Sequence, residues 1–316
     1  MSISVLITTK DREGFLEFVL GRLAPQFRPG DELVVVDDGS ARPLSTPQLQ
    51  AWIGTGTPIC LLRNDESRGY KRARNQGLAA AHGEFVLQLD DDSWPVGDQA
   101  FDRIEQAMAE SPEAGALSFP VHEHWAGGPG GVGSIYPRHR LPDGIQDFAF
   151  IGCAVALRRV VVLRAGGYPE YGAYGGEEEA LGLRLLRLGY IIAVCHAIRV
   201  IHGHEALSVR PAYKSTRQTS VLIELAANRL CCYSENLPSL VARVLGGIEY
   251  GRVLKVGGVA TCRALRVAVK QRKPLQRPGF RLSWRNVLRW LVVRAHIWWV
   301  LRRSPRSGGA SAADAV

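Results

Sequence analysis

The sequence predicts an α/β fold in which a mostly parallel sheet carries helices on both faces, followed by a basic, helical C-terminal appendage. Two observations predict the sheet: β-branched runs alternate with segments of helical periodicity, and two of these runs end in clusters of aspartate. The uneven distribution of charge along the chain indicates the appendage. Residues 243–306 hold 16 Lys or Arg and one acid, so this segment at +15 leaves −6 of the total +9 to the rest of the chain. Such asymmetry indicates an acidic body with an arm that meets an anionic partner.

Composition excludes a disordered or fibrous chain. The 316 residues are 46% hydrophobic and 22% charged, which is enough to bury a large core. The six cysteines are scattered, and the opening segment reads as a strand rather than a secretion signal, so a cytosolic protein with reduced thiols is expected. No stretch of eighteen residues is both apolar and free of charge, and therefore no transmembrane helix is expected.

The first 110 residues alternate between strand and helix patterns. Strands are expected at 3–9, 33–36, 58–62 and 84–89, and helices at 13–23, 71–82 and 97–110. Further along, a helix is expected at 181–188 and a strand at 198–201. This alternation indicates parallel strands joined by helices, and the ligands of such sheets lie at the carboxyl ends of the strands.

Two of the predicted strands end in carboxylates. Asp37 and Asp38 follow one strand, and Asp90, Asp91 and Asp92 follow another. A single aspartate there can simply cap the next helix, and this structural reading stays open for either cluster alone. Five carboxylates at one sheet edge repel one another unless a cation joins them, and oxygen ligands with open positions suit Mg²⁺ or Mn²⁺ carrying a substrate phosphate.

A basic loop lies between the two aspartate clusters. It contains Gly69 and leads into a helix whose start presents Arg68, Lys71, Arg72 and Arg74. The structural alternative is a solvated, charged helix face. A helix N-terminus combined with guanidinium groups is nevertheless suited to an anionic phosphate.

In these residues the chain resembles the family 2 glycosyltransferases, nucleotide-sugar-dependent enzymes of the GT-A fold. Six blocks, in the family's order, carry the resemblance over about residues 2–205: ISVLITTKDR, VVVDDGS, NDESRGYKRARNQG, LQLDDDSWP, IGCAVALRRVVVLRAGGYPEYGAYGGEEEALGLRLLRLGY and IRVIHGHE. A DDD motif alone would be weak evidence for this resemblance, whereas six blocks in the family's order are specific evidence for it.

The resemblance implies a donor site and a metal site. The family's base-contacting aspartate corresponds to Asp38 or Asp37, and its DxD motif, which holds a divalent cation on the diphosphate, falls on Asp90 and Asp92. A histidine after a strand is often structural, but the resemblance places His202 near the metal. The donor-binding residues expected are Thr8, Thr9, Arg12, Asp37, Asp38, Arg68, Arg74, Asn75, Asp90 and Asp91. The expected ligands of Mn²⁺ or Mg²⁺ are Asp90, Asp92 and His202.

The family's Glu-Asp motif, which supplies the general base of inverting members, aligns with Glu177 and Glu178, and Glu178 is the candidate base. The chain departs from the family here, with Glu179 completing a triplet and Ala180 replacing a common aspartate. Favourable interaction with a helix dipole is the structural reading of such a triplet. The departures keep open a second hypothesis, a catalytically silent GT-A-like protein that binds a nucleotide sugar or serves as a scaffold.

The basic arm contains expected helices at 213–233 and 284–303 and four of the seven tryptophans. Cationic residues among Trp and Leu suit an anionic leaflet. The other readings are packing on the body or on another subunit, and binding of nucleic acid, which is disfavoured because no nucleic-acid fold accompanies the arm. The expected division is a GT-A domain at 1–210, a helical basic region at 211–306 and a disordered tail at 307–316.

Together these features predict an inverting, metal-dependent glycosyltransferase. Its expected substrates are a nucleotide-sugar donor and a saccharide or lipid-linked acceptor. The basic arm predicts that the protein is peripheral at the cytoplasmic face of the cell membrane. The identities of the donor base and sugar stay open.

Overall fold

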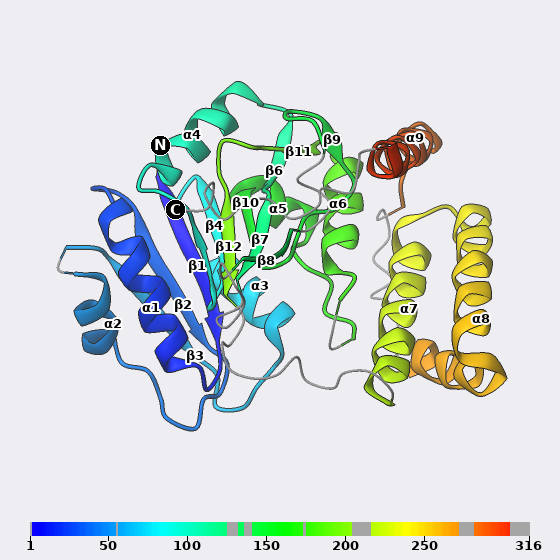
Figure 1. Cartoon of the computed structure of the whole chain (residues 1–316), viewed down its shortest axis with the longest axis horizontal. Coiled ribbons are helices and arrows are strands. Elements are labelled where there is room, and N and C mark those ends of the chain that lie inside the picture. Colours follow the sequence, from blue (N-terminus) through cyan, green and yellow to red (C-terminus); the bar gives the residue numbers. More distant parts are fainter. Residues whose placement is uncertain are drawn as a thin grey trace.

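The N-terminal part of the chain forms an eight-stranded sheet with helices on both faces, and three C-terminal helices stand beside it (Figure 1). The structure is a computed structural model that describes residues 2–54, 56–124, 132–135, 141–172, 175–203, 216–271 and 281–303. The predicted tail at 307–316 and the predicted boundary at 210 lie outside these residues.

The central sheet has the strand order β3-β2-β1-β4-β10-β6-β11-β9. Its strands are β1 Ile3–Thr9, β2 Glu32–Asp37, β3 Ile59–Arg63, β4 Phe85–Asp90, β6 Ala114–Ser118, β9 Gln146–Asp147, β10 Ala154–Arg158 and β11 Ile191–Val194. A second sheet has the order β5-β12-β7-β8, with β5 Ser93–Pro95, β7 Val121–His124, β8 Val132–Ile135 and β12 Val200–Gly203.

The helices of the body are α1 Glu13–Leu23, the short 3₁₀ helix Ala24–Gln26, α2 Thr46–Ile53, α3 Tyr70–Ala80, α4 Ala100–Glu110, α5 Arg159–Ala165 and α6 Glu177–Arg187. The C-terminal helices are α7 Thr216–Asn236, α8 Ser239–Gln271 and α9 Trp284–Arg303. The sequence predicted α1 and α9 with these bounds and missed α2. The predicted helix at 181–188 began four residues later than α6 does, and in the structure all three glutamates lie in the first turn of α6.

The register of the parallel strands explains why the aspartate clusters meet. Strands β3, β2, β1 and β4 are parallel, whereas β10 is antiparallel to β4 and makes the sheet mixed from there on. Thr9 lies opposite Asp37 on one side of β1, and Thr8 lies opposite Asp90 on the other. The carboxyl ends of three neighbouring strands therefore share one edge of the sheet.

Each face of the sheet has its own core. On β1, Ile3, Val5 and Ile7 pack into the cluster that contains α1, α2 and α4, whereas Leu6 packs into the cluster that contains α3, α5 and α6. This alternation is the two-residue period of a strand that is buried on both faces. The strand pattern of the sequence thus sets which helices cover which face.

The C-terminal helices pack on the body and on one another. Apolar residues of α6, α7 and α9 form one cluster, and α7 and α8 share another. A buried ion pair between Arg184 Nη2 and Glu235 Oε1 at 2.9 Å joins α6 to α7. Packing on the body, one of the readings that the sequence left open for the arm, is therefore confirmed. Within the described parts of the chain, no helix has both the length and the apolar content required to cross a bilayer.

Candidate active site

A cavity of about 1010 Å³ opens at the carboxyl edge of the parallel strands. Its walls come from the loops after β1, β2 and β4, from the first turn of α6, from β12 and from α7. This volume is at the upper end of the range of roughly 300–1,000 Å³ found for ligand pockets. Because α7 supplies Leu225 and Arg229, the C-terminal region forms part of the cavity wall.

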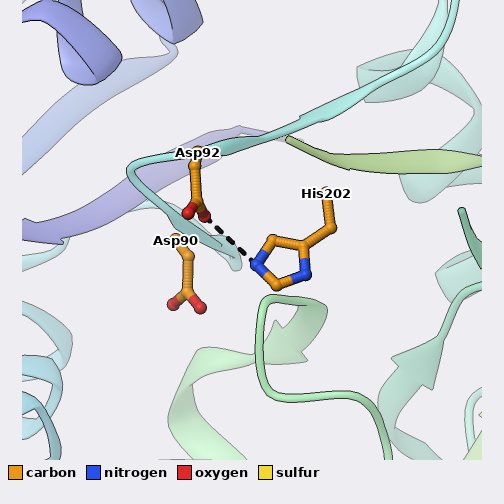
Figure 2. Close-up of side chains that lie close together, drawn as sticks. All are labelled: Asp90, Asp92 and His202. Carbon is orange, nitrogen blue, oxygen red and sulfur yellow. Dashed lines mark ion pairs between the residues drawn. The ribbon is translucent and has the colours of Figure 1, made fainter. Parts of the chain in front are cut away.

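Three potential metal ligands meet on one side of this cavity. Asp90, Asp92 and His202 each offer an atom within 4.8 Å of the other two. Figure 2 shows the three side chains close together. His202 Nε2 lies 3.3 Å from Asp92 Oδ1. Pairing of β12 with β5 sets His202 opposite Ser93, and Gly203 N donates to Asp92 O at 2.7 Å, so sheet pairing brings the histidine to the aspartates. The two carboxylates suit Mn²⁺ or Mg²⁺ by ligand type, and the imidazole is a ligand more typical of transition metals.

Two guanidinium groups hold the aspartates. Arg12 Nη2 lies 2.6 Å from Asp92 Oδ2, and its Nη1 lies 3.2 Å from Asp91 Oδ1. Arg74 Nη2 lies 2.6 Å from Asp90 Oδ1. These cations offset the repulsion among three adjacent carboxylates. The Asp92 oxygen that faces His202 is not the one that pairs with Arg12.

The neighbouring aspartates Asp91 and Asp92 differ in acidity. Burial raises the pKa of Asp91 to about 7, and this rise is opposed by the Arg12 charge and by a hydrogen bond that Thr9 Oγ1 donates at 2.6 Å. Burial also acts on Asp92, but His202 and Arg12 outweigh it and lower the pKa of this carboxyl group. The Asp91 carboxyl group accepts the hydrogen bond from Thr9, whereas the Asp92 carboxyl group lies beside His202.

The two aspartates after β2 have different surroundings. Asp37 is fully buried and accepts hydrogen bonds from Ser40 N at 2.9 Å, from Leu44 N at 3.2 Å and from Arg63. Asp38 lines the cavity and organises the loop at 64–69. Its carboxylate accepts from Asn64 Nδ2 at 2.8 Å, Ser67 Oγ at 2.7 Å, Arg68 N at 2.9 Å and Gly69 N at 2.9 Å. Burial raises the pKa of both groups, but the hydrogen bonds outweigh it and lower both pKa values.

Seven of the ten predicted donor-binding residues line the cavity, namely Thr8, Thr9, Arg12, Asp38, Arg74, Asp90 and Asp91. The other three, Asp37, Arg68 and Asn75, are outside the described lining. Asn75 instead fastens α3 to the segment before α6, because its side chain donates to Tyr168 O at 3.0 Å and accepts from Tyr168 N at 2.8 Å.

The three glutamates of α6 all line the cavity, but their partners differ. Glu177 is buried, accepts a hydrogen bond from Tyr70 OH at 2.8 Å and lies 3.5 Å from Arg74 Nη1. Glu179 is buried and pairs with Arg294 of α9. Glu178 is half-buried, and its Oε1 lies so near Gly152 that a Cβ there would come within 2.7 Å of it. Glu177 and Glu179 are thus tied to cations on opposite neighbours.

Sequence reasoning missed several residues of this site. Tyr70 connects α3 to α6, since its hydroxyl also accepts from Gly175 N at 2.9 Å, and burial raises its pKa. Phe148, Leu225 and Arg229 line the cavity as well. Leu225 and Arg229 belong to α7, beyond the blocks that resemble the family, and no local pattern marks them. Tyr70 lies within the block NDESRGYKRARNQG, but the pattern of that block singles out only the basic residues beside it.

Comparison with known proteins identifies the family. The sequence model of glycosyl transferase family 2 matches residues 4–162, which is half of the chain. The chain belongs to glycosyl transferase family 2. The O-antigen biosynthesis protein RfbC of Myxococcus xanthus is 29% identical over 228 residues, which cover 66% of this chain and 18% of that protein. An uncharacterized glycosyltransferase of Haemophilus influenzae is 26% identical over 206 residues, covering 61% of this chain and 72% of that protein.

Solved structures show the same fold for this family 2 glycosyltransferase. The mannosyltransferase PcManGT from Pyrobaculum calidifontis, in complex with GDP-Man and Mn²⁺, matches with a TM-score of 0.54 at 17% identity and covers 97% of this chain and 88% of that one. TarS 1-349 of S. aureus, in complex with UDP-GlcNAc, matches with a TM-score of 0.58 at 15% identity and covers 95% and 82%. The chain therefore has the GT-A fold.

Proposed function

We propose that this enzyme is an inverting, metal-dependent glycosyltransferase that moves one sugar from a nucleotide donor to an acceptor hydroxyl. The observation that carries the proposal is the placement of two kinds of group in one cavity. The metal-ligand cluster Asp90, Asp92 and His202 lies at the sheet edge, and Glu178 lies in the first turn of the helix across from it. An inverting transfer needs both a leaving-group site and a base.

On the donor side, Asp90, Asp92 and His202 would hold Mn²⁺ or Mg²⁺, which supplies Lewis-acid stabilisation of the diphosphate oxygens when bound. PcManGT is described with GDP-Man and Mn²⁺, which supports this assignment. Arg12 and Arg74 keep the carboxylates in place. The loop at 64–69, organised by Asp38, and the end of β1 would contact the nucleotide.

On the acceptor side, Glu178 would accept the proton of the attacking hydroxyl. The hydroxyl oxygen forms a bond to the anomeric carbon as the bond from that carbon to the diphosphate breaks, and the nucleoside diphosphate leaves with the electron pair. Glu178 is proposed for this role because it aligns with the family's motif, lines the cavity and is half-buried, whereas Glu177 and Glu179 are buried. General-base help of this kind typically contributes about 10² to 10⁴ in rate.

The acceptor is proposed to be a saccharide that is carried on a lipid, which the enzyme meets at the cytoplasmic face of a membrane. The outer side of α9 supports this. Trp284, Leu288, Val292 and Trp299 are 61%, 65%, 60% and 47% exposed and fall within about one quarter of the helix circumference. The exposed cation Arg285 lies on the flank of this stripe. Apolar residues beside cations match the headgroup layer of an anionic leaflet.

Other observations agree with this location. α8 adds the exposed residues Leu240, Val244 and Ile248, spaced four apart on one side of the helix. The start of α9 lies beside the start of α8, because Arg281 Nη1 donates to Ser239 Oγ at 3.3 Å. All six cysteines are free, as is usual in a reducing compartment. The relative RfbC is named for O-antigen biosynthesis.

The experiment that tests the activity is a donor panel. The purified chain is incubated with UDP-, GDP- and dTDP-sugars and Mn²⁺, with and without bacterial lipid extract, and released nucleotide is measured. We expect release from one class of donor, increased by the extract and abolished by a chelator. Binding of a nucleotide sugar without release under every condition would favour the silent, donor-binding alternative that Ala180 and the glutamate triplet keep open.

A further inference from the structure

Helix α9 packs against α6 and is tied to it at two points. Asn286 Nδ2 donates to Leu186 O at 3.0 Å near the C-terminal end of α6, and Arg294 donates to the Glu179 carboxylate in its first turn. Val287 and Trp290 pack in the same cluster as Leu183 and Leu186 between these ties.

The Arg294 side chain has a defined setting. Its guanidinium lies over the Phe148 ring at 5.3 Å and over the Trp290 ring at 5.0 Å, and it donates to Tyr233 OH at 3.3 Å. The side chain is 27% exposed and that of Glu179 is 9% exposed. A partly desolvated pair between aromatic walls interacts more strongly than a surface ion pair. Phe148 and Glu179 both line the cavity, so the contact lies at its wall.

The first turn of α6 is held from the α3 side as well, because Gly175 N donates to Tyr70 OH at 2.9 Å and Gly175 O accepts from Lys71 Nζ at 2.9 Å. Gly176, its N-terminal cap, has φ +80° and supplies no side-chain hydrogen bond, and Gly175 before it has φ +76°. Successive side chains of a helix point about 100° apart. Glu177 is tied to Arg74 and Tyr70 of α3, and Glu179 about 200° further around is tied to Arg294. These two ties together fix the rotation of the turn, and hence the direction of the intervening Glu178.

We propose that Arg294 is a positioning residue of the active site. By holding Glu179 against α9 it orients the first turn of α6 so that Glu178 faces the acceptor. This proposal rests on the proposed function of Glu178. It makes α9 part of the active site, although the helix lies far outside residues 4–162, over which the family is matched.

The test compares Arg294→Met with Arg289→Met. Arg289 lies on the same helix and carries the same charge, but it is exposed, donates to Gln146 at 2.9 Å and is outside the described cavity lining. With the donor that the panel identifies, we expect Arg294→Met to lower kcat about tenfold while the donor Kd is unchanged, because the donor contacts lie on other elements. Arg294→Lys should recover part of the loss. Arg289→Met should keep the wild-type kcat.

Two further measurements separate positioning from a general loss of structure. Glu179→Gln should reproduce the effect of Arg294→Met, and the double variant should be no slower than either single variant, since one contact is removed in each case. Amide hydrogen exchange at 177–183 should be faster in Arg294→Met than in Arg289→Met. Wild-type kcat in Arg294→Met, or equal loss in both arginine variants, would overturn the proposal. If the wild-type chain releases nucleotide from no donor, the proposed function fails, whereas unchanged exchange at 177–183 defeats the positioning role by itself.

Discussion

The buried guanidinium of Arg74 donates from Nη2 to Asp90 Oδ1 at 2.6 Å. Its Nη1 lies 3.5 Å from Glu177 Oε1, and its Nη2 also donates to Gly152 O at 2.9 Å. One side chain from α3 therefore connects the metal-ligand cluster to the first turn of α6. The two halves of the proposed active site are joined through a charge that is almost inaccessible to solvent.

Removing this charge should cost stability. Arg74→Met leaves Asp90 without its cation and leaves Glu177 with only Lys71, whose Nζ lies 3.8 Å from Oε2. We therefore expect the free energy of unfolding to fall by about 3 to 5 kcal/mol. The control is Arg72→Met on the same helix, whose side chain is 55% exposed and which should change stability by less than about 1 kcal/mol. Urea unfolding of both variants measures the difference. Equal losses of unfolding free energy in the two variants would show that Arg74 stabilises the fold no more than the exposed Arg72 does.

The metal assignment predicts a selective loss of Mn²⁺ binding. Asp92→Asn should weaken Mn²⁺ affinity at least about tenfold, because one anionic ligand is lost. Asp65→Asn removes an exposed carboxylate on the loop after β3 and should leave the affinity unchanged. Titration calorimetry with Mn²⁺ alone reports both affinities. Unaltered binding to Asp92→Asn would remove this residue from the ligand set.

The base assignment separates the three glutamates. Glu178→Gln should lower kcat by about 10² or more with unchanged donor Kd, because the amide keeps the shape but cannot accept the proton. Glu179→Gln should lower kcat by about tenfold, and Glu177→Gln should chiefly lower the melting temperature, since Tyr70 and Arg74 lose a buried partner. Steady-state kinetics and thermal unfolding of all three variants distinguish these outcomes. Normal turnover in Glu178→Gln would move the base to a neighbour.

The buried carboxylate of Asp37 predicts a dependence of stability on pH. Its pKa is lowered, because hydrogen bonds from Ser40, Leu44 and Arg63 outweigh the opposing effect of burial. A carboxylate with a lower pKa in the folded state stabilises the protein above its unfolded pKa of about 3.9, and the contribution is lost as the pH falls through the folded value.

Asp37→Asn should therefore lower the free energy of unfolding by about 2 to 3 kcal/mol at pH 7, and the gap from the wild type should narrow below pH about 4. Urea titrations at pH 7, 5 and 3.5 follow the gap. A gap that is constant over this range would mean that folding does not lower the pKa of Asp37.

The outer face of α9 predicts binding to anionic vesicles. Leu288→Glu combined with Val292→Glu should abolish sedimentation with vesicles of phosphatidylglycerol and phosphatidylcholine, because both apolar contact and charge attraction are lost. Val160→Glu on α5, where the native side chain is 55% exposed, is the matched control and should bind as the wild type does. Binding should weaken with salt and be absent with pure phosphatidylcholine. Equal sedimentation of all three proteins would exclude α9 as the membrane-binding surface.

The sequence alone determined the early fold and the chemistry of the sheet edge. The periodicity of α1 and the β-branched runs of β1, β2 and β4 specify these elements locally, because packing on both faces of a sheet demands residues of that spacing. Parallel strands align their carboxyl ends, so the two aspartate clusters had to meet. The family followed from motifs within the same segment.

Only the tertiary structure decided how individual side chains are used. Asp37 and Asp38 are adjacent in sequence, but the pleat turns one into the core and the other toward the cavity. The sequence does not distinguish the three consecutive glutamates from one another. Contacts from α3 and α9 distinguish them, and each of these helices lies about a hundred residues away in sequence. Because α7 and α9 are also far from the motifs in sequence, the sequence did not predict their contributions to the site. Local patterns report which face of an element is apolar, whereas the partner of a charged side chain is set by which distant element packs against it.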